Sequence, residues 1–345
     1  MSIPSSSSVL IRGVNIPSLA LSCYLAQAGI NVLLIDEESR LAKENEFVSF
    51  DSYSTDFLNE IRIKTDVNSS TKDFFKNAKE ILLHKMCTVS WGTSIVRNDL
   101  GKDFQLIDLH NKIFQHQTSF FIDSEKLEIN SDLNLSIKNV ALFSWKIEGI
   151  INGNLNQHIL TQQKIEENLL EAYALKKPNI LEKFLKQKNN AFNLRESKLN
   201  LHLSQQRIIE AGDLLPNLAV FDERLKQETN FYNWCKFGEF HLLILGSTSQ
   251  HNLFNVAKWI KSNFPLRLFY LPNSESNEQI FDYFSVIEGE KKLIIVRPDR
   301  YIGLILDRLD LEVLENYLAN VLQLQTKGKP ISQKLIGSNI IENYP

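Results

Sequence analysis

The chain has 345 residues, which exceeds the usual size of a single domain and favours two. Apolar residues make up 43%, charged residues 23%, and the formal net charge is −3. This composition is typical of an ordinary globular protein and lacks the basic excess that nucleic acids or anionic membranes attract. We therefore expect neither nucleic acid nor a membrane as a partner.

The numbers of glycine and cysteine residues narrow the class of protein further. Glycine accounts for 13 of 345 residues, about 4%, against a typical usage of roughly 7%. Because glycine lets a backbone approach phosphate closely, the chain has few places to cradle a nucleotide. Cys23, Cys87 and Cys235 are far apart and odd in number, so no disulfide framework or CxxC pair is predicted. With no signal-like start and no run of ~18 apolar residues, we expect a cytoplasmic protein.

The first predicted unit is a βαβ unit between Ser8 and Asp36. An apolar run, Val9 to Ile11, precedes Gly13, a stretch with helical spacing follows, and a second strand, Val32 to Ile35, ends at Asp36. Such a unit starts a parallel sheet that is buried on both faces.

The middle of the chain has mixed patterns. Helices are predicted over 56–63 and 72–84, and residues 133–195 have the spacing of two or three helices. Between Cys87 and Ile122 the apolar period falls toward two, with turns near 98–102 and 110–112. This period predicts a β-meander.

The pattern of the last part of the sequence predicts a second domain. Strands over 241–245, 266–271, 293–296 and 302–306 alternate with helices over 252–263, 277–284 and 311–324. The order β-α-β-α-β-β-α is that of a thioredoxin-like domain, although Gly246 to Ser249 contains no cysteine for thiol chemistry. We expect domains at 1–203 and 204–325 and an extended tail at 326–345.

The turn after the first strand has part of a dinucleotide-binding pattern. Such a turn needs glycine at three positions, and here they hold Gly13, Asn15 and Ser18. The acidic residue expected at the end of the second strand is Asp36, which would accept ribose hydroxyls. One glycine of three and an acid remain compatible with a plain βαβ unit.

Several segments together resemble the FAD-dependent aromatic-ring flavoprotein monooxygenases, in the phenol-hydroxylase-like branch. The segments are Val9 to Asp36, Val89 to Val96, Phe104 to Ile122, Asn134 to Glu148, Ala211 to Pro216 and Val296 to Asp299. The resemblance implies an α/β fold with a Rossmann-type FAD-binding domain and a thioredoxin-like C-terminal extension. It also implies FAD as cofactor and an oxidoreductase activity.

The chain departs from this family where the flavin would bind. Counting back from Trp145, the family's Gly-Asp pair falls on Ser119 and Phe120, and Asp123 replaces the carboxylate only if the loop shifts. At the position of the family's glycine-rich segment this chain has Ile129 to Asp132, which contains no glycine. The family's substrate-binding sheet also has no room before residue 134. We therefore expect a reduced FAD-binding domain that lacks its substrate sheet.

The remaining side chains that could bind a metal or take part in catalysis predict no further site. The seven histidines show no metal-ligand spacing, and surface or capping roles are expected for them. No catalytic residue is assigned. The cofactor-binding candidates are Gly13, Asn15, Ser18, Asp36 and Asp123, with FAD weakened or lost.

The leading hypothesis is a degenerate, non-hydroxylating homologue, a pseudoenzyme retained to bind a protein partner or to form a homo-oligomer. The alternative is an active FAD-binding monooxygenase that uses NAD(P)H and oxygen on an aromatic or polyketide-like substrate. A third hypothesis is a small-ligand or nucleotide sensor that uses the βαβ turn alone.

Overall fold

A computed structural model describes residues 3–39, 46–66, 68–83, 87–99, 103–176 and 192–326. The chain divides into two compact units, which are described separately. The first comprises Met1–Ile151 and Leu170–Lys177, and the second comprises Asn152–Leu169 and Pro178–Pro345.

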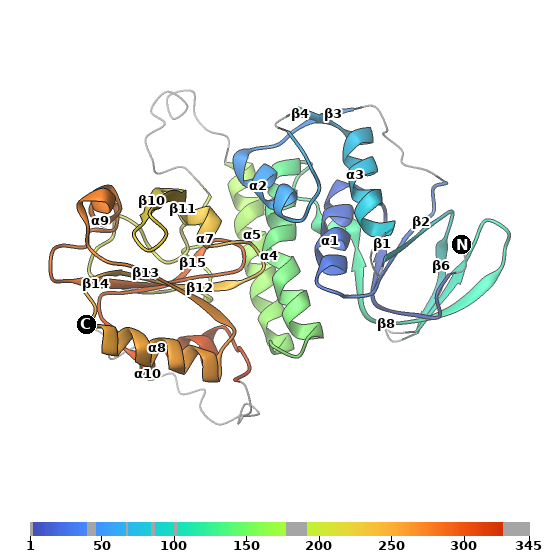
Figure 1. Cartoon of the computed structure of the whole chain (residues 1–345). Helices are drawn as coiled ribbons and strands as arrows, with labels where there is room; N and C mark the ends of the chain where they lie inside the picture. Colours follow the sequence, from blue (N-terminus) through green and yellow to red (C-terminus); the bar gives the residue numbers. More distant parts are fainter. Residues whose placement is uncertain are drawn as a thin grey trace. The chain divides into compact units, whose positions relative to one another are not determined.

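The first unit is built on a six-stranded sheet of order β5-β2-β1-β8-β7-β6 (Figure 1). The strands are β1 (Ser6–Arg12), β2 (Val32–Asp36), β5 (Cys87–Trp91), β6 (Ser94–Asp99), β7 (Asp103–Ile107) and β8 (Ile113–Asp123). Strands β5, β2, β1 and β8 run parallel, with α1 (Ile16–Gln27) connecting β1 to β2. The predicted βαβ unit is confirmed, and the sheet is consistent with a Rossmann-like FAD-binding fold.

The predicted β-meander is smaller than expected. Strands β6, β7 and β8 are antiparallel neighbours, but β5 pairs with β2 at the opposite edge of the sheet. The alternation of apolar and polar residues does not reveal this pairing, because it shows which side chains share a face of a strand and not which strand lies beside it. On one face of the sheet, Leu10 and Leu33 of the parallel strands pack with Phe104 and Leu106 of β7.

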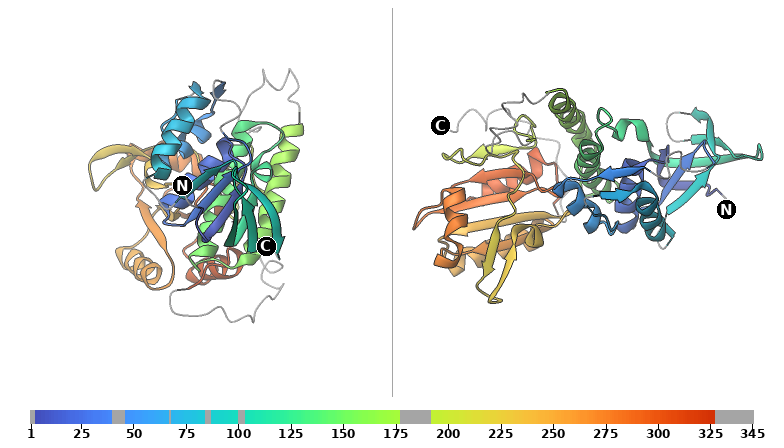
Figure 2. Two further views of the ribbon diagram at one scale, coloured as in Figure 1. Left: turned by 90° about the vertical axis from the view of Figure 1, so that its right-hand side faces the viewer. Right: turned by 90° about the horizontal axis from the view of Figure 1, so that it is seen from above.

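Helices cover the other face of this sheet (Figure 1, Figure 2). They are α1, α2 (Ser52–Glu60), α3 (Thr71–Leu83) and α4 (Leu133–Ile151), and the end of α5 (Leu160–Leu175) belongs to the same unit. A short ribbon of β3 (Phe47–Ser49) and β4 (Asn68–Ser70) lies before α3. Helix α2 begins before the expected residue 56 because Asp51 caps it, its side chain accepting from the N–H of Ser54 at 2.8 Å.

The second unit contains a five-stranded sheet of order β13-β12-β14-β15-β9. Its strands are β9 (Leu201–Leu203), β12 (Phe240–Gly246), β13 (Leu266–Leu271), β14 (Lys291–Val296) and β15 (Ile302–Leu306). β12 is parallel to β13 and antiparallel to β14, and β14 is antiparallel to β15. All four strands predicted from 241 to 306 are present.

Short elements cover both faces of the second sheet (Figure 1). Helices α8 (Gln250–Asn263) and α10 (Leu311–Asn316) lie on one face, and α10 continues into a π-helical turn at Tyr317–Val321. On the other face lie α7 (Phe231–Trp234), α9 (Glu278–Phe284) and the hairpin of β10 (Ala219–Asp222) and β11 (Gln227–Asn230).

The units do not divide at residue 203 as expected from the sequence. β9 pairs with β15, and the bridge between Leu155 and Leu324 ties residues after α4 to the same unit. Both pairings join residues far apart in sequence, so no local pattern predicts them. Residues 327–345, most of the expected tail, and residues 177–191 lie outside the described part. No helix in the described residues is long and apolar enough to cross a bilayer.

Candidate functional site

The predicted cofactor residues meet at the carboxyl ends of β1, β2 and β8, where α1 begins. Gly13 follows β1 with φ +91°, and its N–H donates to the carbonyl of Ile35 at 2.8 Å. A Cβ placed on Gly13 would meet Oγ of Ser124, the first residue of the 3₁₀ turn η1 (Ser124–Leu127). The positive φ favours glycine at this position whether or not a nucleotide binds.

Asn15 and Ser18 cap α1. Oδ1 of Asn15 accepts from the N–H of Ser18 at 2.8 Å, and Oγ of Ser18 accepts from the N–H of Asn15 at 2.9 Å. This reciprocal capping box satisfies two amides that a phosphate would otherwise contact. Both side chains predicted to stand at glycine positions thus bond to the helix end.

Asp36 is also engaged by the turn. Its Oδ2 accepts from the N–H of Val14 at 2.6 Å, and its Oδ1 accepts from the N–H of Glu38 at 2.8 Å. The carboxylate that was predicted to bind ribose hydroxyls therefore holds the βαβ turn to the segment after β2.

Asp123 lies at the end of β8, beside the end of β1. Its carboxylate pairs with the guanidinium of Arg12, which is its register partner across the parallel pair. Ser119 and Phe120, by contrast, lie within β8, where Phe120 pairs with Val9. The end of the strand is thus at Asp123, three residues beyond the position that ungapped counting gave for the family's carboxylate.

Glu128 is a site residue that the sequence analysis missed. Its Oε1 accepts from the Nδ2 of Asn15 at 2.8 Å. The two residues are 113 positions apart, so only the pairing of β1 with β8 brings them together. A carboxylate beside the start of α1 is stabilised by the helix dipole, and it occupies the place where an anionic ligand would be attracted.

The segment from Ile129 to Asp132 forms a tight turn before α4. Asn130 and Ser131 have φ of 47° and 59°, and Ile129 and Asp132 form an antiparallel bridge. Asp132 caps α4 by accepting from the N–H of Leu135 at 3.0 Å. The left-handed backbone that glycine usually adopts is present here without any glycine.

These residues do not fit a dinucleotide pyrophosphate in this arrangement. The capping box satisfies amides of the helix start, and both oxygens of Asp36 accept backbone N–H groups. The carboxylate of Glu128 would repel a phosphate that approached Asn15. A flavin nucleotide would have to displace several of these bonds.

The other sequence candidates are structural. Cys235 is buried, and burial raises the pKa of its thiol, which does not suit thiol chemistry. His116 and His241 are buried, which corrects the expectation of surface or capping roles. His116 bonds to Oγ of Ser7 at 2.9 Å and to the carbonyl of Pro4 at 2.8 Å. Within the described ranges no cluster of three or more His, Cys, Asp or Glu side chains could hold a metal ion.

No family model and no curated protein matches this sequence. Solved structures do match its fold. The rebeccamycin biosynthetic enzyme RebC with reduced flavin has a TM-score of 0.67 at 10% identity, and the match covers 92% of this chain and 99% of that one. The flavin-dependent monooxygenase PieE, in complex with FAD and substrate, has a TM-score of 0.61 at 7% identity, covering 92% and 99%.

A third match is OxyS, an anhydrotetracycline hydroxylase from Streptomyces rimosus. Its TM-score is 0.62 at 11% identity, and the match covers 92% of this chain and 99% of that chain. The resemblance to FAD-dependent monooxygenases expected from the sequence is therefore confirmed for the fold. At this identity a shared fold does not carry function with it.

Proposed function

We propose that this chain is a degenerate homologue of the FAD-dependent monooxygenases, non-hydroxylating and retained to bind a protein partner or to form an assembly. One observation carries the proposal: the turn that would hold the cofactor is bonded to the protein's own side chains. Asn15 binds Ser18 and Glu128, and Asp36 binds the N–H of Val14. FAD binding is weakened or lost in this proposal.

The connection between β8 and α4 supports the same proposal. Only η1 and the turn at Ile129 to Asp132 separate the two elements. We infer that the family's substrate-binding sheet is missing here. Without its walls, a hydroxylase would lack the dry pocket that protects a reactive oxygen intermediate.

The second unit has the topology that we assign to a thioredoxin-like domain. Its strands β13, β12, β14 and β15 are adjacent in this order, with a parallel pair and two antiparallel pairs. The residues after β12 contain no cysteine, and Cys235 is buried. We assign this domain to structure or partner binding and not to thiol–disulfide exchange.

The competing function is an active FAD-dependent monooxygenase that uses NAD(P)H and oxygen. It is favoured by the overall likeness to flavoproteins and by the retention of Gly13 and Asp36 at the ends of β1 and β2. Binding would require Glu128 to swing away and Asp36 to exchange backbone N–H groups for ribose hydroxyls.

The absorbance spectrum of the purified chain, recorded before and after incubation with excess FAD and desalting, tests the proposal. We expect no retained flavin bands. A stoichiometric yellow protein with oxygen-dependent NAD(P)H oxidation would overturn it, and Asp36→Ala should then lower flavin content. Retention of ADP-ribose without flavin would instead support a nucleotide sensor.

A further inference from the structure

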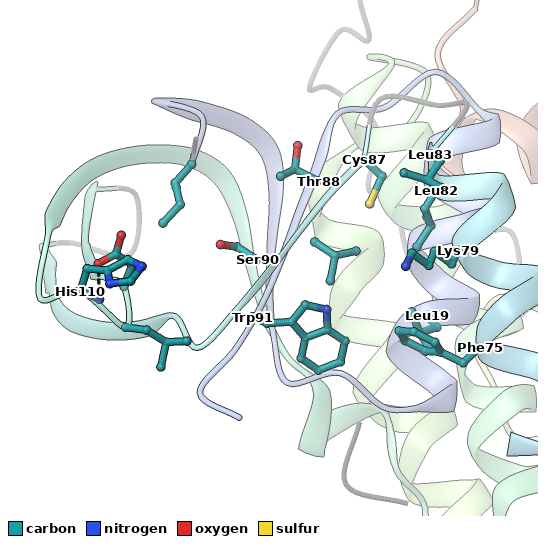
Figure 3. Close-up of a pocket in the computed structure, with 14 residues that line it drawn as sticks. Leu19, Phe75, Lys79, Leu82, Leu83, Cys87, Thr88, Ser90, Trp91 and His110 are labelled. Carbon is teal, nitrogen blue, oxygen red and sulfur yellow. Dashed lines mark hydrogen bonds between the residues drawn. The ribbon is translucent and has the colours of Figure 1, made fainter. Parts of the chain in front are cut away.

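The first unit contains a cavity that is separate from the cofactor turn. Its volume is about 550 Å³, within the range of about 300–1,000 Å³ that small-molecule sites occupy. None of the predicted cofactor residues lines it. It lies along β5, the terminal strand of the six-stranded sheet (Figure 3).

The cavity follows the edge of β5 and not one of its faces. All five residues of the strand, from Cys87 to Trp91, line it. Since successive strand residues point to opposite faces, a space bordered by all of them must straddle the strand's edge. An edge strand directs backbone N–H and C=O groups outward, so the cavity offers hydrogen-bonding groups beside its side chains.

The two sides of the cavity differ in chemistry. On the helix side, Trp91 lies beside Phe75 of α3, with ring centroids 5.8 Å apart, and Leu19 and Leu82 add apolar surface. On the meander side, the lining comes from Thr88 and Ser90 of β5 and from residues 108–110, the turn after β7. A flat apolar body fits the first side, and the second side supplies hydrogen-bonding groups.

Lys79 adds a positive charge at this cavity. It is exposed on α3, and Figure 3 shows its ammonium group directed into the cavity, on the side where Trp91 and Phe75 lie. Within the described residues Lys79 forms no ion pair. Asp108, the acidic residue in the lining, has its Oδ1 bonded to the N–H groups of His110 and Lys112, both at 2.9 Å.

We propose that this cavity binds a flat, apolar organic acid, with its ring against Trp91 and Phe75 and its carboxylate on Lys79. The edge of β5 supplies further donors to the acid's oxygens. None of the predicted cofactor residues lines the cavity, so the proposal does not rest on flavin binding. The site is a ligand site in addition to the proposed degenerate function.

Isothermal titration calorimetry of the full chain with 2-naphthoate tests this proposal. We expect saturable binding of one molecule per chain. Lys79→Met should weaken it about fivefold, since a partly exposed charge pair contributes modestly. Lys76→Met, at an exposed residue of the same helix that does not line the cavity, is the matched control and should leave the affinity unchanged.

Two further measurements separate charge from stacking. The uncharged 2-naphthamide should bind the unmodified chain about as weakly as naphthoate binds Lys79→Met. Trp91→Leu should weaken both ligands alike, with circular dichroism and thermal unfolding used to verify its fold. Absence of saturable naphthoate binding, or equal losses with Lys79→Met and Lys76→Met, would overturn the proposal.

Discussion

The side-chain amide of Asn15 donates to Oε1 of Glu128 at 2.8 Å and so joins the start of α1 to the segment before α4. The same Asn15 accepts from the N–H of Ser18 through its Oδ1. One residue therefore caps the helix and positions a carboxylate beside its positive end. Both bonds stabilise the protein, and both oppose an incoming phosphate.

The cap at Asn15 predicts a specific loss of stability. Asn15→Ala removes the acceptor for the N–H of Ser18 and the donor for Glu128, and it should lower the free energy of unfolding by about 1 kcal/mol. Asn15→Ser keeps a capping oxygen and should cost less. Urea denaturation followed by circular dichroism measures both, and equal stability of the three proteins would contradict a capping role.

The turn before α4 predicts a gain of stability. Ser131 has φ of 59° and follows Asn130 at 47°, the backbone of a hairpin turn that favours Asn-Gly. A non-glycine residue in this region costs on the order of 1 kcal/mol, so Ser131→Gly should raise the free energy of unfolding by about that amount. Ser131→Ala is the control because it removes the hydroxyl but keeps the strain. If Ser131→Ala stabilises the protein equally, backbone strain is not the cause.

Local patterns in the sequence predicted much of the fold. The apolar runs around Val9 and Val32 and the spacing between them predict β1, α1 and β2 because these elements depend on neighbouring residues. Cys87 to Trp91 was assigned to the meander because alternation does not reveal which strand is the partner. Glu128 was missed for the same reason, since its contact with Asn15 depends on the register of β1 with β8.

His241 on β12 predicts a pH dependence of stability. It is fully buried, and burial, together with the charges of Arg267 and Arg300, lowers its pKa to about 3 from an ordinary value near 6.5. Below about pH 6.5 the unfolded chain takes up a proton that the folded chain does not accept until about pH 3. The contribution of the neutral His241 imidazole to the free energy of unfolding is therefore fully present above pH 6.5 and is lost as the pH falls toward 3.

Replacing His241 by phenylalanine removes this titration. The aromatic ring keeps a partner for Phe269, whose centroid lies 6.0 Å from that of His241. From about pH 7 to about pH 5, the unmodified chain should lose about 2 kcal/mol more than the variant. His251→Phe, at an exposed histidine of α8, is the control and should leave the pH dependence unchanged. Parallel pH profiles for His241→Phe and the unmodified chain would refute the role of His241.

Arg297 is the centre of a buried charge network in the second unit. Its Nη1 donates to Glu166 of α5 at 2.8 Å, and its Nη2 donates to Asp299 at 2.6 Å, with all three side chains fully buried. Ser197 donates to the same oxygen of Glu166 at 2.8 Å. The two carboxylates hold the pKa of Arg297 above its ordinary value, so the cation stays charged despite its burial.

Arg297→Met should therefore destabilise the second unit by about 3–5 kcal/mol, because it removes a cation that binds two buried carboxylates, those of Glu166 and Asp299. Arg267→Met removes an exposed pair with Glu239 and should cost less than about 1 kcal/mol. Combining Arg297→Met with Glu166→Gln should recover part of the loss, since the second change removes one of the two buried negative charges. Chemical denaturation of the unmodified chain, Arg297→Met, Glu166→Gln and the double variant measures this coupling, and additive losses would show that Arg297 and Glu166 do not act as a pair.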